Sequence, residues 1–248
     1  MAQHGKRYSG ARGAIDRERV YSPVEAVRLL KSSDGAKFDE TVEVHMNLGL
    51  NVRHAEEQLR GTMMLPHGTG REARVAVFAE GDKAREAEEA GADVVGSADL
   101  AKRVEEGFTD FDVAIATPDQ MGNVGKLGRV LGPRGLMPNP KTGTVTMDVG
   151  KAVREAKAGK LEYRTDRGAN VHIPIGKKSF DERSLVENYA ALIDEIVRAK
   201  PAAAKGRYIK KITLTSTMGP GIHVDPTRTR DIAEELDGAT QEAVEATA

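Results

Sequence analysis

The chain has 248 residues, of which 39% are hydrophobic and 30% are charged, so it carries enough apolar side chains for globular cores and is not disordered throughout. It contains no cysteine, which excludes disulfides, thiolate zinc sites and cysteine nucleophiles. No apolar run resembles a signal sequence or approaches the roughly 18 residues of a membrane span, so we expect a cytoplasmic protein that neither is exported nor crosses a membrane.

The formal net charge of −1 hides an uneven distribution along the chain. Residues 80–112 carry eleven acidic side chains against four basic ones, and residues 231–248 carry six acidic side chains and no basic one. Residues 122–141 carry four basic side chains and no acidic one, and residues 205–230 carry six basic against one acidic. The two positive segments are therefore candidates to face phosphates, although the whole chain lacks the positive excess usual in nucleic-acid binding.

The first 65 residues predict one helix and one half-buried strand. Ser22 and Pro23 form an N-cap and a first-turn proline for an amphipathic helix that ends near Asp34 and Gly35. Residues 42–48 then alternate apolar and polar side chains, which is the period of a strand with one face toward solvent.

After a turn at residues 66–70 the strands become continuously apolar, as in buried parallel sheets. The segments that follow predict strand, helix, strand, helix and strand, at residues 74–80, 83–90, 94–95, 100–106 and 112–117. A further amphipathic helix is predicted at residues 149–158, and Gly159 is expected to stop it. A small parallel α/β lobe is expected.

Alternation returns beyond Gly159 in residues 161–164 and 171–175, followed by a helix at 181–198 and a strand at 208–217. Neither the first 65 residues nor the last 70 would bury a core alone, so we expect them to share one lobe. The predicted fold class is α/β with two domains: a discontinuous α+β domain I (residues 1–67 and 160–230), an inserted Rossmann-like α/β domain II (residues 68–159) and a disordered acidic tail (residues 231–248).

No constellation of residues indicates catalysis. The six histidines are dispersed, no GxSxG turn is present, and no GxGxxG or P-loop spacing follows a predicted strand. Three carboxylates lie near a strand end, where acidic residues can bind magnesium: Asp110, Asp112 and Asp119. The favoured interpretation is that they are solvated side chains of the strand and turn. We expect no enzyme, no metal and no cofactor; the alternative is a nucleotide-dependent enzyme that uses the α/β lobe.

Residues 122–145 contain six glycines, three prolines and the basic side chains Lys126, Arg129, Arg134 and Lys141. Glycine lets a ligand approach the backbone, proline keeps a loop pre-shaped, and cations without nearby acids pair with phosphate. The segment is expected to be an exposed basic loop that faces folded RNA or a partner. The alternative is a surface loop with no binding role. Because aromatic residues make up only 4%, recognition by rows of stacked bases is not expected.

Several blocks of sequence together resemble the L-one family of bacterial large-subunit ribosomal proteins. The blocks, which occur in the family's order, are KFDETVE at 37–43, RGT at 60–62, LPHGTG at 65–70, AIATPD at 114–119, the signature at 125–145 and TMGPG at 217–221. The resemblance implies a discontinuous first domain with an inserted α/β domain. It also implies binding to the lateral-stalk helices of large-subunit rRNA, with stalk movement as deacylated tRNA leaves the exit site, and in some members repression of the operon's own mRNA.

Carried over by motif, the resemblance places the main rRNA contacts in the first domain, on Phe38, Thr41, Thr217, Met218 and Gly219. For Phe38 and Met218 the alternative is packing in the core. We add supporting contacts because they are basic or polar and lie in the same domain: Lys37, Arg53, Arg164, His172 and Lys177. His172 has the alternative of an ordinary strand-surface residue, and the chain is expected to be monomeric when free and located on the ribosome.

Overall fold

The computed structural model describes residues 5–228, which divide into two compact units. Unit 1 comprises residues 5–70 and 163–228, and unit 2 comprises residues 71–162. We propose that these units are the two domains expected from the sequence. The predicted disordered tail at 231–248 lies outside the described residues.

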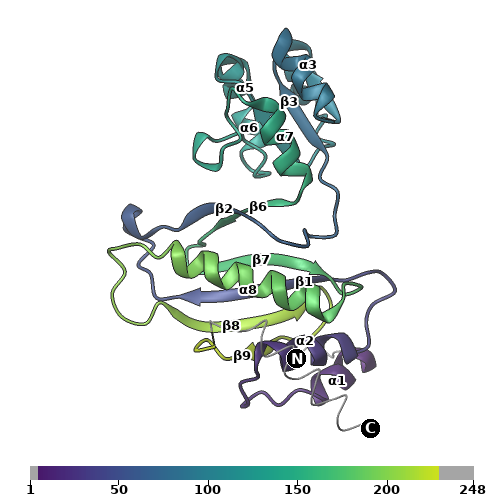
Figure 1. Ribbon diagram of the computed structural model, residues 1–248, viewed down its shortest axis with the longest axis vertical. Coiled ribbons are helices and arrows are strands. Elements are labelled where there is room, and N and C mark those ends of the chain that lie inside the picture. Colours follow the sequence, from purple (N-terminus) through teal and green to yellow (C-terminus); the bar gives the residue numbers. More distant parts are fainter. Residues whose placement is uncertain (1–4, 229–248) are drawn as a thin grey trace. The chain divides into compact units, whose positions relative to one another are not determined.

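Unit 1 is built on a four-stranded antiparallel sheet in the order β7-β1-β8-β9 (Figure 1). Its strands are β1 (Thr41–Leu48), β7 (Asn170–Lys177), β8 (Ile209–Ser216) and β9 (Ile222–Val224). Strand β1 lies between two strands from the far end of the chain, so both halves of unit 1 share one sheet. The predicted alternation in β1 is confirmed, since Val42, Val44, Met46 and Leu48 are each at most 1% exposed.

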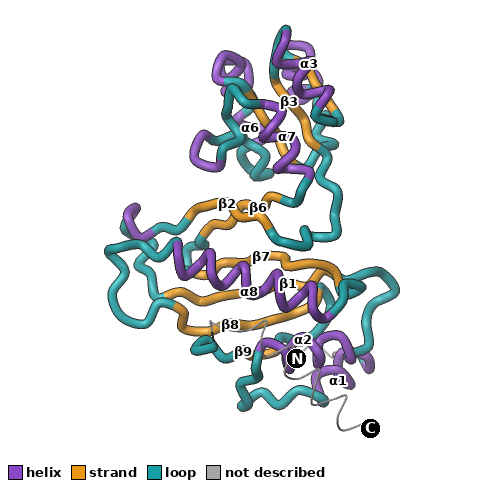
Figure 2. The backbone as a smooth tube through the Cα atoms, viewed as in Figure 1, coloured by secondary structure: helices purple, strands orange, loops and turns teal. Residues whose placement is uncertain are grey.

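Helices α2 (Pro23–Ser32) and α8 (Glu182–Arg198) pack against this sheet (Figure 2). Their buried apolar side chains cover one face, and the other face carries the polar members of each strand. A capping box starts α2: the Ser22 hydroxyl accepts from the backbone of Glu25, whose carboxylate accepts from the backbone of Ser22. Both helices were predicted. Helix α1 (Lys6–Gly13) in the basic N-terminal arm and the 3₁₀ turn η1 (Ala55–Glu57) were not.

A separate two-stranded sheet pairs β2 (Arg60–Met64) with β6 (Lys160–Arg164). Strand β2 was not predicted, because its sequence Arg-Gly-Thr-Met-Met has no clear alternation of polar and apolar residues. Gly61 has no room for a side chain, since a Cβ there would collide with the ring and hydroxyl of Tyr163.

Unit 2 is a three-stranded parallel sheet in the order β4-β3-β5. Its strands are β3 (Val75–Phe78), β4 (Val94–Gly96) and β5 (Val113–Ala116), and its longer helices are α3 (Asp82–Glu89), α4 (Ala98–Glu105) and α7 (Val149–Lys157). Val75 and Val77 pack into one buried cluster, while Ala76 and Phe78 pack into a second. Burial on both faces accounts for the continuous apolar runs, and the predicted parallel α/β lobe is confirmed.

The expectation of an exposed basic loop over residues 122–145 is wrong for its first part. The segment contains α5 (Met121–Lys126) and α6 (Gly128–Leu131), after η2 (Pro118–Gln120) and before η3 (Pro140–Thr142). Val124, Leu127 and Leu131 are fully buried in a core cluster. Their spacing of three and four residues is helical, and burying them outweighs the low helix propensity of the intervening glycines.

Candidate nucleic-acid interface

Thr41, Thr217 and Lys177, three of the predicted contact residues, meet at one end of the unit 1 sheet. The backbone N–H of Thr217 donates to the Thr41 carbonyl at 3.0 Å, and the N–H of Thr41 donates to the Thr217 hydroxyl at 3.0 Å. The Lys177 ammonium donates to the Thr41 hydroxyl at 2.8 Å. These bonds join β1, β7 and the turn after β8, so the two threonines are held in a fixed geometry.

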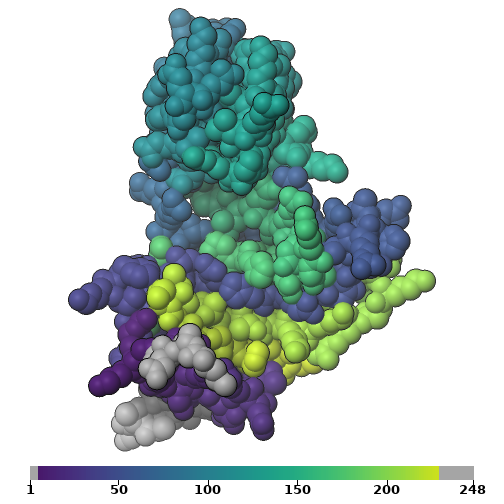
Figure 3. All heavy atoms as spheres, turned by 180° about the vertical axis from the view of Figure 1, so that it is seen from behind, coloured from purple at the N-terminus to yellow at the C-terminus, as the bar shows by residue number. Residues whose placement is uncertain are grey.

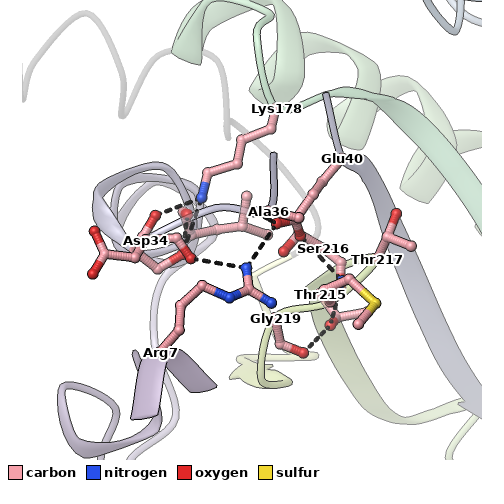
Figure 4. Close-up of polar contacts among 12 residues, drawn as sticks. Arg7, Asp34, Ala36, Glu40, Lys178, Thr215, Ser216, Thr217 and Gly219 are labelled. Carbon is pink, nitrogen blue, oxygen red and sulfur yellow. Dashed lines mark hydrogen bonds and ion pairs between the residues drawn. The ribbon is translucent and has the colours of Figure 1, made fainter. Parts of the chain in front are cut away.

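The buried carboxylate of Glu40 holds the segments at this end of the sheet together. Sequence reasoning did not identify this residue. Its side chain is 1% exposed and accepts from Met218 N at 3.1 Å, from the Arg7 guanidinium at 3.3 Å, from the Ser216 hydroxyl and from Ala36 N (Figure 4). We call this set of contacts the Glu40 clamp. No sequence signal marks Glu40, because a single carboxylate between Asp39 and Thr41 resembles any solvated residue.

Burial alone raises the pKa of the Glu40 carboxyl, but the donors around it outweigh that effect. Hydrogen bonds from Ser216, Ala36 and Met218, together with the charge of Lys178, bring the pKa of Glu40 below its ordinary value of 4.5. Glu40 is therefore ionised at neutral pH, and it fixes both the segment before β1 and the turn after β8.

The Glu40 clamp holds Phe38 and Met218 out toward solvent. Their side chains are 55% and 52% exposed, so the alternative that they pack in the core is wrong. The segment carrying Phe38 is held further by Asp39, which accepts from the N–H of Ser179 at 3.1 Å and from its hydroxyl at 2.7 Å. Lys37 beside it is exposed. Hydrogen bonds thus fix the backbone that carries these two large apolar side chains, which are exposed and can pack against a partner.

Gly219 has a packing reason to be glycine. A Cβ at this position would collide with the Ser216 hydroxyl, the group that donates to Glu40. The backbone of Gly219 is also fixed, since its N–H donates to the Ser216 carbonyl at 3.0 Å and its carbonyl accepts from the Thr215 hydroxyl at 3.3 Å. The turn is therefore narrow enough for a ligand backbone to approach.

Arg53 and Arg164 meet in an open groove at the other end of β1. The groove has a volume of about 600 Å³ and is lined by Val52, Arg53, Gln58, Arg164, Thr165, Asp166 and Arg167. We call it the arginine groove. The carboxylate of Asp166 is engaged within its own turn, because it accepts hydrogen bonds from the backbone N–H groups of Gly168 at 2.8 Å and Asn170 at 2.7 Å. Three guanidinium groups therefore outnumber the single carboxylate in this groove.

His172 lies on the open face of the sheet, paired across the strands with His45. Their Nδ1 atoms are 2.8 Å apart, so one ring donates and the other accepts, and a neutral imidazole is required. Burial, followed by the proximity of His172, lowers the pKa of His45 from its ordinary 6.5, while Glu43 on the same strand acts in the opposite sense. The sequence had not paired these histidines.

Stability is expected to fall as the pH drops from about 7 to 5.5, and His45→Asn is expected to reduce that fall. Because the pKa of His45 is lower in the folded protein, the unfolded chain binds more protons just below pH 6.5, which favours unfolding. His172, Glu43, and Asp166 3.6 Å from the His172 Nε2 are the charged or titratable groups around the pair. Urea unfolding over this pH range, with the exposed His54→Asn as control, measures the effect; equal pH dependence in all three proteins would contradict it.

In unit 2, the predicted basic residues are all exposed, but they do not form one loop. Lys126 ends α5, Arg129 lies in α6, Arg134 donates to the Thr109 hydroxyl, and Lys141 lies in η3. None of the four forms an ion pair with a carboxylate of residues 5–228. They are a scattered set of cations on unit 2, free of ion pairs within the described residues, and among the four only Arg134 has a side-chain hydrogen-bond partner there.

Two of the three carboxylates suggested as magnesium ligands have other partners, and the third, Asp119, is an exposed residue of η2 after β5. Asp112 pairs with Arg71 at 2.6 Å, and Asp110 pairs with Arg74 just before β5. This is the amino end of a parallel strand, whereas ligands in such sheets bind at the carboxyl ends. Among residues 5–228 no group of three or more histidine or acidic side chains is placed to hold a metal, and no helix there is long and apolar enough to cross a membrane.

Comparison with known proteins gives consistent matches over most of the chain. The family described as "Ribosomal protein L1p/L10e family" matches residues 29–220. Large ribosomal subunit protein uL1 of Thermobifida fusca is 61% identical over 232 residues, covering 94% of this chain and 99% of the relative. The uL1 proteins of Rubrobacter xylanophilus (64% identity, 92% and 99% coverage) and Saccharopolyspora erythraea (62%, 94% and 98%) are similarly close.

Proposed function

The chain belongs to the ribosomal protein L1p/L10e family, and from this membership we propose that it is a structural component of the large ribosomal subunit that binds rRNA in the cytoplasm. Membership in a family of ribosomal proteins also confirms the expectation that the chain is not an enzyme. The nucleotide-dependent alternative has no supporting observation among the described residues.

The observation that best supports RNA binding is the Glu40 clamp with Phe38 and Met218 above it. Single exposed apolar side chains are ordinary, but two large ones held at the same clamp form the kind of apolar patch that a partner covers. Beside them lie the hydroxyl groups of Thr41 and Thr217, which suit ribose 2′-OH and phosphate groups, and the narrow turn at Gly219. A rigid surface with few charges favours recognition of a folded RNA by shape.

Finer assignments follow from the same proposal. We assign the rRNA target to the lateral-stalk helices, and the clamp end of the sheet to the main contact. The free cations of unit 2, Lys126, Arg129, Arg134 and Lys141, are proposed to meet exit-site tRNA or rRNA as the stalk moves. Repression of the operon's own mRNA would use the unit 1 surface, since a stalk-like hairpin presents the same shape.

Filter binding to a transcript of the stalk helices tests the proposal. Affinity for this transcript is expected to exceed that for an unrelated hairpin of equal length by at least about a thousandfold, the lower end of the range usual for specific over non-specific binding. The measurement is made at two salt concentrations, because non-specific phosphate binding weakens steeply with salt and specific contacts less so. Equal affinity for the two RNAs at both salt concentrations would refute the proposal.

A further inference from the structure

The turn between α8 and β8 is the most basic segment of unit 1. Residues 198–211, which we call the basic turn, contain no acidic side chain. They contain six basic side chains, all exposed: Arg198, Lys200, Lys205, Arg207, Lys210 and Lys211. Its large apolar residues, Tyr208 and Ile209, are buried, so the exposed surface is made of cations and small side chains.

A bulge in the sheet exposes two consecutive lysines. Asn47 pairs with Lys211 and Leu48 with Ile209, so Lys210 has no partner residue on β1. In a regular strand, neighbouring side chains point to opposite faces, and one lysine of the two would face the helices. The bulge turns this part of β8 so that Lys210 and Lys211 are both exposed.

Half of the cations in the basic turn have no partner among the residues that the structure describes. Arg198 pairs with Glu195 at 3.5 Å, Lys200 lies 5.8 Å from the centre of the Tyr208 ring, and Arg207 donates to the Ile209 carbonyl. Within residues 5–228, no carboxylate pairs with Lys205, Lys210 or Lys211. Their ammonium groups are free to meet an external anion without first breaking an ion pair.

The basic turn lies at the same end of the sheet as the arginine groove. Lys211 is opposite Asn47, whose side chain donates to Asn170 at 2.7 Å and to the Gly168 carbonyl at 3.4 Å, next to Arg167. In Figure 3 the yellow-green turn projects from unit 1 beside the blue segment that holds η1. The Glu40 clamp is at the other end of β1, a strand of eight residues or roughly 25 Å.

We propose that the basic turn is a second RNA contact, which binds the phosphate backbone of the folded rRNA whose apolar and hydroxyl contacts lie at the Glu40 clamp. The inference rests on the proposed function and extends it. Exposed ammonium groups in a segment whose own large apolar side chains are buried fit a row of phosphates, whereas the cores of protein interfaces are depleted in lysine. An RNA that spans the open face would thus be held at both ends.

The test is a salt titration of stalk-transcript binding by full-length protein carrying Lys205→Gln, Lys210→Gln and Lys211→Gln together. Each phosphate contact adds about 0.7 to 0.9 to the slope of log affinity against log salt, so the slope is expected to fall by about 2 to 3. At moderate salt we expect a roughly ten- to hundredfold loss of affinity. Replacing the same three lysines by arginine is expected to keep the slope.

The matched control removes three exposed cations from the helices of unit 2, with Arg85→Gln, Lys102→Gln and Lys151→Gln. It changes the net charge equally, and we expect an unchanged slope. If the slopes of the basic-turn variant and the control are equal while Phe38→Ala still weakens binding, the basic turn is not a contact and the inference is overturned. If wild-type protein shows no preference for the stalk transcript, the proposed function itself fails.

Discussion

Replacing Phe38 or Met218 by alanine is expected to weaken binding to the stalk transcript by about 1–3 kcal/mol, or roughly 5- to 150-fold, the scale of a lost stacking contact. Both side chains are more than half exposed and contribute little to the core, so the free energy of unfolding should change by less than about 0.5 kcal/mol. Filter binding and urea unfolding of the same preparations measure the two effects.

Met147→Ala is the matched control for Met218→Ala. Met147 is 53% exposed, close to the 52% of Met218, but it lies in unit 2 and outside the Glu40 clamp. Binding by Met147→Ala should equal that of the wild type. Unchanged affinity in folded Phe38→Ala and Met218→Ala proteins would show that the apolar pair does not contact RNA, and the main contact would then have to lie elsewhere.

Glu40→Ala is expected to lower the free energy of unfolding by about 3–5 kcal/mol, the largest effect on stability that we predict. The substitution leaves the partly buried N–H groups of Ala36 and Met218 and the Ser216 hydroxyl without their acceptor. Glu40→Gln keeps one acceptor oxygen and should cost about 1–3 kcal/mol. Urea unfolding measures both, with the exposed Glu56→Ala as control.

The pH dependence separates the charge of Glu40 from its shape. Because the folded protein lowers the pKa of this carboxyl below 4.5, its contribution to stability is present above the unfolded value and is lost as the pH falls through the folded one. Between pH 6 and 3, Glu40→Gln should therefore lose less stability than the wild type. Equal losses would mean that the clamp does not depend on ionised Glu40.

The regular parts of the fold follow from the sequence because their signals are local. The alternation in β1 predicts an exposed face and a buried face, and the apolar runs of β3 and β5 predict a sheet covered on both sides. The prediction for the segment at 122–145 was wrong because its six glycines indicated a loop. The helical spacing of Val124, Leu127 and Leu131, which are buried together, determined the structure instead.

The site is harder to predict, since its contacts join distant parts of the chain. Met218 N donates to Glu40 across 178 positions, and Thr217 N to Thr41 across 176. No composition or periodicity reports such pairs, so Phe38, Thr41 and Thr217 were placed together only through the family resemblance. The bulge that exposes Lys210 also cannot be predicted from the sequence, because it depends on the register of β8 against β1.

The position of β1 at the centre of the unit 1 sheet has a consequence for biosynthesis. Strand β8 begins 161 positions after β1 ends, so at 5–20 residues per second roughly 10–30 s of translation separate the two. Unit 2, which is continuous in sequence, can fold within that interval, whereas β1 has both edges unpaired until β7 is made and one edge unpaired until β8 follows. If the proposed function holds, a nascent chain binds RNA at the Glu40 clamp only after the turn that follows β8 has emerged, so RNA binding is restricted to nearly complete chains.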